Sequence, residues 1–139
     1  MPPHSHIHVV FLNRQSPKAI LCRLMRAGLT LSHEGGVRYR KSRIFGQAGW
    51  VLVDERDFGI DRFLGWRLKY SPIGIRLMYG PDAGCDYDIR ENRMTISPSL
   101  NVAYLTKIPG VVDFSFYLRP LKDFLEETPF ENMECVADL

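Results

Sequence analysis

The hydrophobic pattern is clearest near the start of the chain, where it predicts a strand followed by a helix. Residues 5–12 alternate between polar and apolar positions and then become continuously apolar, which is typical of a β-strand ending at Asn13. The helix is expected over residues 17–27, because Ser16 is a good N-cap, Pro17 favours the first helical position and Gly28 favours the C-terminal end. Its apolar stripe consists of Ile20, Leu21, Leu24 and Met25.

The middle of the chain predicts short strands and one helix that its glycines disfavour. Residues 29–32 predict a short strand and Glu34-Gly35-Gly36 a turn. Residues 37–44 form the next predicted strand, and its basic side chains on both faces favour a position at the edge of a sheet. A core strand is expected over residues 49–54. Residues 57–70 predict a helix, although Gly59 and Gly65 lower the helical propensity of this segment.

The second half predicts a three-stranded meander and a terminal helix. Its strands are expected over residues 75–79, 85–89 and 93–97, separated by turns rich in Gly, Pro, Asp and Asn. Residues 120–127 favour a helix, and about 128–139 are expected to be an acidic C-terminal tail. The order of elements indicates a single α+β domain of 1–139, with a mainly antiparallel sheet, two or three helices and a possible N-terminal βαβ unit.

Length and composition agree with one folded domain. The chain has 139 residues, of which 45% are hydrophobic, enough to build a core. No apolar run approaches the ~20 residues that span a bilayer, so we expect no membrane contact. The first residues lack the features of a signal peptide, and the three cysteines are too few and too scattered for a disulfide framework. These observations favour a cytoplasmic location.

The charges are divided unevenly along the chain. Residues 1–43 carry eight basic side chains and one acidic one, a net charge of +7 (8 − 1), whereas residues 44–139 carry ten basic and fifteen acidic ones, a net −5 (10 − 15). Such asymmetry indicates that one end meets an electrostatic partner.

The acidic half supplies the first candidate surface. Acidic side chains can steer a protein onto a basic nuclease and cover its substrate site. The residues expected to bind such a partner are Asp82, Asp86, Asp88, Asp123, Glu126 and Glu127, with Glu131 and Glu134 nearby in the sequence. The spacing of Asp82, Asp86 and Asp88 does not match a calcium-binding loop, and no metal site is expected there.

The basic half supplies an alternative surface for nucleic acid. Phosphate contacts need clustered cations, and Tyr39 can stack on a base. The residues expected to form this surface are Arg14, Lys18, Arg23, Arg26, Arg38, Arg40, Lys41 and Arg43. No helix-turn-helix, zinc-finger or ribonucleoprotein motif supports it, so charge alone carries this alternative.

A second alternative is a small enzyme or a metal-binding protein. His4, His6 and His8 alternate and would lie on one face of a strand, from which imidazoles can converge on zinc or copper. Cys22 lies one helical turn from both Lys18 and Arg26, and cations so placed favour the thiolate form. Neither pattern has a recognisable partner in the sequence, and we expect no cofactor.

Taken together, the compact domain, the lack of a catalytic motif and the charge asymmetry favour a non-catalytic binding protein. It would neutralise or occlude a macromolecular partner, in the manner of an immunity protein or of an inhibitor of a toxin or nuclease. Charge patterning does not determine the oligomeric state.

Overall fold

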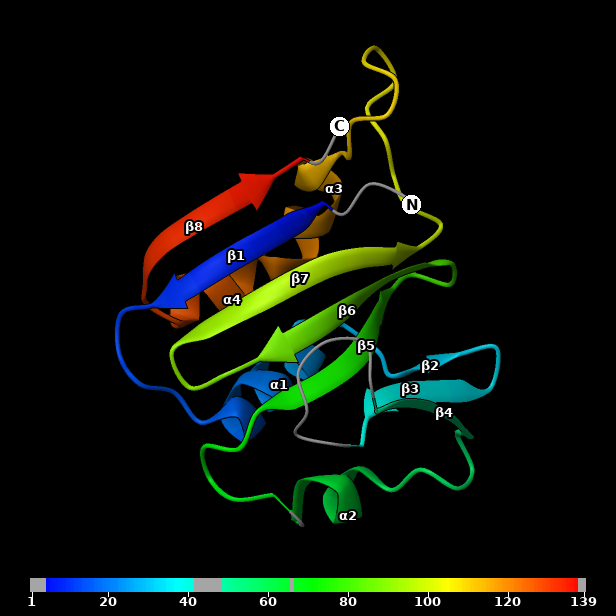
Figure 1. The fold of residues 1–139 in the computed structure, drawn as a ribbon, viewed down its shortest axis with the longest axis vertical. Coiled ribbons are helices and arrows are strands. Elements are labelled where there is room, and N and C mark those ends of the chain that lie inside the picture. Colours follow the sequence, from blue (N-terminus) through cyan, green and yellow to red (C-terminus); the bar gives the residue numbers. More distant parts are fainter. Residues whose placement is uncertain (1–4, 42–48, 66, 138–139) are drawn as a thin grey trace.

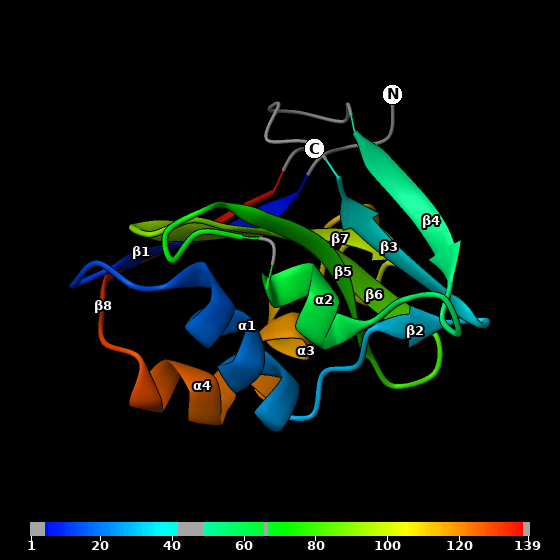
Figure 2. The same cartoon turned by 90° about the horizontal axis from the view of Figure 1, so that it is seen from below.

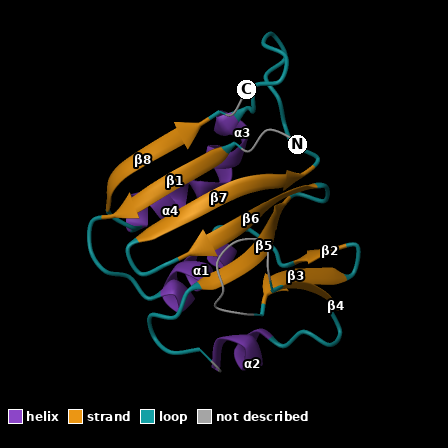
Figure 3. Cartoon of the chain, viewed as in Figure 1, coloured by secondary structure: helices purple, strands orange, loops and turns teal. Residues whose placement is uncertain are grey.

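The computed structural model describes residues 5–41, 49–65 and 67–137. The chain folds into one antiparallel sheet with helices packed on one face (Figures 1 and 3). This confirms the predicted single α+β domain. The strands are β1 (His6–Phe11), β2 (Ser32–His33), β3 (Gly36–Arg40), β4 (Trp50–Asp54), β5 (Ile73–Tyr79), β6 (Ala83–Ile89), β7 (Arg93–Leu100) and β8 (Phe130–Val136).

The helices form three segments on the covered face of the sheet, as the view from below shows (Figure 2). The first is α1 (Pro17–Arg26), and the second is α2 (Ile60–Gly65). The third runs without a gap through α3 (Phe114–Leu118), a 3-10 turn η1 (Arg119–Leu121) and α4 (Lys122–Glu127). No helix in the described ranges is both long and apolar enough to cross a membrane.

The residues that predicted the ends and the apolar stripe of α1 have the expected roles in the structure. The Ser16 hydroxyl accepts a hydrogen bond from the backbone N–H of Ala19, and Pro17 is the first helical residue. Gly28 adopts a φ of +107°, a left-handed conformation that favours glycine and ends the helix. Ile20, Leu21 and Leu24 are fully buried, so the apolar stripe of the helix faces the sheet.

The strand order is β2-β3-β5-β6-β7-β1-β8, with β4 paired to β3. The predicted meander is confirmed as β5-β6-β7. The N-terminal βαβ unit is not formed, because β1 pairs antiparallel with β7 and β8 while β2 lies at the far end of the sheet. The β7 and β8 strands, which come much later in the sequence, take the places beside β1 that a crossover would have used.

Three sequence-based assignments change in the folded chain. The strand β3 is not an edge, since it lies between β4 and β5, whereas β4 has β3 as its strand partner and leaves Leu52 72% exposed. The acidic segment after residue 128, expected as a loose or docked tail, contributes β8, and Met133 packs against the core. The expected helix of residues 57–70 shortens to α2, which keeps only Phe63 buried.

The core lies between the sheet and the helices. Alternation along the strands sends one set of side chains to this core, including Ile7, Val9, Ile75, Tyr87 and Ile96. The other set points to the face that no helix covers, which we call the open face. Register places its side chains in neighbouring rows: Arg38 and Arg40 on β3, Gly74 and Arg76 on β5, Asp86 and Asp88 on β6, Thr95 and Ser97 on β7, and His6 and His8 on β1.

Candidate binding surfaces

The open face holds a network of ion pairs in its centre. Arg76 Nε lies 2.8 Å from Asp86 Oδ1, and Arg38 Nη1 lies 3.8 Å from Asp86 Oδ2. The second carboxylate, that of Asp88, lies 3.2 Å from Arg40 Nη2 and 3.3 Å from Arg90 Nη2. Two residues of the predicted acidic surface are thus interleaved with two of the predicted basic surface, and with Arg76 and Arg90 the network keeps a net charge of +2 (4 − 2).

Arg40 is the most enclosed member of this network. Its side chain is 5% exposed and lies across Gly74 of the neighbouring strand. A Cβ added to Gly74 would lie 2.8 Å from Arg40 Cβ and 3.0 Å from Arg40 Nε, which is closer than van der Waals contact allows. The missing side chain at Gly74 therefore lets the guanidinium lie flat on the sheet and reach Asp88.

The histidines of β1 belong to the same face and lie beside hydroxyl groups of β7. His6 Nδ1 is 3.1 Å from Ser97 Oγ, and His8 Nδ1 is 3.2 Å from Thr95 Oγ1. Their ring centroids are 5.5 Å apart. The described residues contain no group of three or more His, Cys, Asp or Glu side chains able to hold a metal ion, and His4 lies outside them.

The remaining acidic candidates lie away from this network. Asp123, Glu126 and Glu127 are exposed on α4, and Asp82 is exposed in the turn between β5 and β6. The six residues of the predicted acidic surface therefore fall into three places rather than one. The largest of these continues into β8, where Glu131 and Glu134 are also exposed. We call the five exposed carboxylates of α4 and β8 the acidic edge: Asp123, Glu126, Glu127, Glu131 and Glu134.

The acidic edge differs from the ion-pair network of the open face in two ways, although Glu134 lies on that face opposite His8. None of its carboxylates takes part in an ion pair within the described ranges, and residues 122–137 contain five acidic side chains against one lysine, a net charge of −4 (1 − 5). In addition, β8 is the last strand of the sheet, so its outer backbone groups face no other described strand (Figure 1). The apolar side chains of Leu12 and Phe130 are 58% and 39% exposed where β8 begins.

The predicted basic surface is also divided. Lys18, Arg23 and Arg26 lie on α1, on the covered side of the sheet, whereas Arg38 and Arg40 lie on the open face. Arg23 Nη1 donates to Thr128 Oγ1 at 3.2 Å, which ties α1 to the end of α4. The Arg14 guanidinium lies 3.4 Å from the centre of the Tyr70 ring, and Lys41 borders a cavity beneath α2. Arg43 lies outside the described residues.

The three cysteines are free thiols in different surroundings. Cys22 is exposed on α1 and Cys135 is exposed on β8, whereas Cys85 is buried in β6. Burial raises the pKa of the Cys85 thiol far above its ordinary value, and the neighbouring Asp86 carboxylate raises that pKa further. Cys85 is therefore a core side chain rather than a nucleophile.

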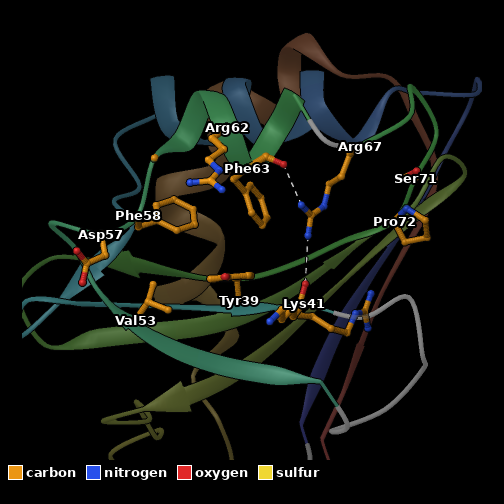
Figure 4. Close-up of a pocket in the computed structure, with 12 residues that line it drawn as sticks. Tyr39, Lys41, Val53, Asp57, Phe58, Arg62, Phe63, Arg67, Ser71 and Pro72 are labelled. Atoms are coloured by element: carbon orange, nitrogen blue, oxygen red, sulfur yellow. Dashed lines mark hydrogen bonds between the residues drawn. The ribbon is translucent and has the colours of Figure 1, made fainter.

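A cavity of about 480 Å³ lies between α2 and the β3-β4 pair (Figure 4). The sequence did not predict it. Tyr39, Phe58 and Phe63 contribute rings to it, and Lys41, Arg62 and Arg67 contribute cations. The residues that line the cavity come from separate segments of the chain, so no local sequence motif predicts it. The only sequence signal is the mixture of aromatic and basic residues over 57–67, which helix formation alone explains equally well.

Comparisons with known proteins give no guide to these surfaces. No protein-family model, no curated protein and no solved structure matches the chain.

Proposed function

We propose that the protein is a non-catalytic inhibitor that occludes a basic macromolecular partner, such as a nuclease toxin, through its acidic edge. The observation that carries this proposal is the uncompensated charge of the α4-β8 region. Five exposed carboxylates lie there with one lysine, whereas the Asp86 and Asp88 carboxylates at the centre of the open face are already paired with arginines. Uncompensated charge attracts an oppositely charged partner from a distance and accelerates its association.

The surroundings of the acidic edge suit protein binding. The exposed edge strand β8 offers a row of backbone donors and acceptors with which an extended segment of a partner can pair. Leu12 and Phe130 supply apolar contact area beside the charges, and the Leu12 N–H donates to Pro129 O at 3.1 Å, which holds the two segments together. An apolar centre with a charged rim is the usual composition of a binding site for protein.

The nucleic-acid alternative has less support from the geometry. Its cations are distributed over both faces of the sheet, and those of the open face are engaged by Asp86 and Asp88. Phosphate binding needs several free cations on one surface.

The test is affinity capture from the native host at about 0.15 M salt, where weak surface electrostatics are already screened, with and without added nuclease. The bait is compared with a charge-reversed variant, Glu126→Lys, Glu127→Lys and Glu131→Lys. A matched control carries the same change at three exposed acids elsewhere, Glu55→Lys, Asp61→Lys and Asp82→Lys. The captured protein is then purified and its nuclease activity is assayed with one equivalent of each bait.

Support requires a basic protein that survives nuclease treatment, binds the native and control baits but not the reversed variant, and loses its activity when bound. Recovery of nucleic acid alone would refute the proposal. Equal capture by the reversed variant, or capture of a protein whose activity is unaffected, would refute it as well.

A further inference from the structure

The cavity beneath α2 lies at the opposite end of the sheet from the acidic edge, and the inference drawn from it is independent of the proposed function. It exists because α2 stands away from the strands. The helix is six residues long and buries Phe63, while Ile60 and Leu64 are partly buried against the core. A volume of about 480 Å³ is within the range of small-molecule sites, roughly 300–1,000 Å³.

An aromatic cluster forms one wall of this cavity. The ring centroids of Tyr39, Phe58 and Phe63 are 5.2 to 5.4 Å apart, so each ring packs on the other two. Tyr39 comes from β3, Phe58 from the segment between β4 and α2, and Phe63 from α2 itself. Figure 4 shows the three rings beside the open volume, with Val53 of β4 beneath them. A planar ring of a ligand can stack on this wall.

The position of α2 over the strands is held by Arg67. Its Nη1 donates to the Phe63 carbonyl at 2.8 Å and its Nη2 donates to the Arg40 carbonyl at 3.2 Å. The guanidinium also lies 3.8 Å from the centre of the Phe63 ring. These contacts join the end of the helix to β3 on one side of the cavity.

The charge around the cavity is positive. Four cations line it, those of Arg40, Lys41, Arg62 and Arg67, and Asp57 is the one acidic side chain among its lining residues, a net charge of +3 (4 − 1). The Arg40 guanidinium also pairs with Asp88 on the open face. Within a partly enclosed and partly apolar space, such a charge balance favours an anion over a neutral or cationic molecule.

We propose that this cavity binds a small aromatic anion, with its ring against Tyr39 and Phe58 and its phosphate or carboxylate near Lys41 and Arg62. The proposed ligand must carry both an aromatic ring and a negative group. The aromatic wall explains why a ring is needed, and the cations explain why the ring must carry a negative group.

The proposal is tested by isothermal titration calorimetry of the full chain with four probes. Adenosine 5′-monophosphate represents an aromatic phosphate and indole-3-carboxylate an aromatic carboxylate. Adenosine supplies a ring without the anion, and inorganic phosphate supplies the anion without a ring. We expect at least one aromatic anion to bind with a Kd below about 1 mM, and about tenfold more tightly than either partial probe. The first two probes distinguish a phosphate ligand from a carboxylate ligand.

Three variants locate the binding. Lys41→Glu and Arg62→Glu change exposed side chains of the cavity and should weaken binding by about tenfold each, whereas Lys107→Glu, an exposed lysine in the loop before α3, should not change it. Val53→Phe reduces the volume without changing the charge and should also weaken binding. Far-UV circular dichroism confirms that each variant is folded.

No binding of either aromatic anion would overturn the proposal. Equally tight binding of adenosine or of phosphate alone would overturn it too, since only one of the two requirements would then act. The proposal would also be overturned if the folded Lys41→Glu and Arg62→Glu variants bound the aromatic anions as tightly as Lys107→Glu does.

Discussion

Replacing Gly74 by alanine should destabilise the fold, although alanine is otherwise the better strand residue. The added Cβ would lie 2.8 Å from Arg40 Cβ, 3.0 Å from Arg40 Nε and 3.2 Å from Arg40 Cζ. Because the first of these atoms is attached directly to the β3 backbone, it cannot move aside by a change of rotamer. The strands must separate locally and the guanidinium must leave its place beside Asp88.

The expected cost follows from these contacts. Overpacking of a well-packed position costs about 1–3 kcal/mol. Loss of the charged hydrogen bond to Asp88 adds less than its usual ~1.5–3 kcal/mol, because the Asp88 side chain is 31% exposed and solvent replaces part of the interaction. Alanine loses less backbone entropy on folding than glycine does, which offsets about 0.5–1 kcal/mol of this cost. The net loss of unfolding free energy should be about 2 kcal/mol.

Urea denaturation followed by tryptophan fluorescence measures this loss, and with a slope of ~2 kcal/mol/M the midpoint should fall by about 1 M. Gly84→Ala is a matched control in the neighbouring strand, where the closest atom is Met78 Sδ at 2.6 Å, the far part of a flexible side chain. It should cost less. In an Arg40→Gly background, Gly74→Ala should cost nothing or stabilise, a coupling of at least ~1 kcal/mol. An equal cost of Gly74→Ala in both backgrounds would show that Arg40 is not the obstacle.

Three further predictions concern the helix cap, the thiols and alkaline pH. Ser16→Ala removes the acceptor for the Ala19 N–H and should lower the unfolding free energy by about 1 kcal/mol, whereas Thr106→Ala, at an exposed position in the loop before α3, is expected to cost less. In the native protein at pH 8, Cys22 and Cys135 should react with a thiol reagent and Cys85 only after denaturation; reaction of all three before unfolding would contradict its burial. Burial raises the pKa of both Cys85 and Tyr87, so the unfolded chain releases protons that the native chain retains, above about pH 9 at Cys85 and above about pH 10 at Tyr87, and stability should fall by up to ~1.4 kcal/mol per pH unit for each group in its range. Denaturation midpoints between pH 7 and 10.5 measure this slope, which Cys85→Ala should reduce; a constant midpoint in both proteins would contradict it.

Local signals predicted the elements that depend on local physics. The caps of α1, its apolar stripe and the meander β5-β6-β7 follow from neighbouring residues, because hydrogen-bonded turns and side-chain periodicity act over a few positions. The expected helix over residues 57–70 was too long: among its described residues only Ile60–Gly65 are helical, and the glycines near each end of α2 lower the helical propensity.

Positions within the sheet could not be predicted in this way. Basic residues on β3 suggested an edge, but Asp86 and Asp88, more than forty residues later in the chain, compensate Arg38 and Arg40 and allow β3 to lie inside the sheet. The same long-range pairing brings β8 beside β1 and turns an expected tail into the last strand. Charge compensation and strand order both depend on contacts between distant segments, for which a single sequence holds no local signal.

The sequence by itself therefore determined the class of the fold, most strands, the main helix and the uneven distribution of charge. Tertiary structure alone decided which charges are neutralised and which stay uncompensated. It divided the six predicted acidic residues, pairing Asp86 and Asp88 with arginines and leaving those of α4 exposed beside β8. It also assembled the cavity beneath α2 from residues of three segments. The physical reason is that periodicity and capping act between neighbours in the chain, whereas electrostatic compensation and cavity formation act between neighbours in space.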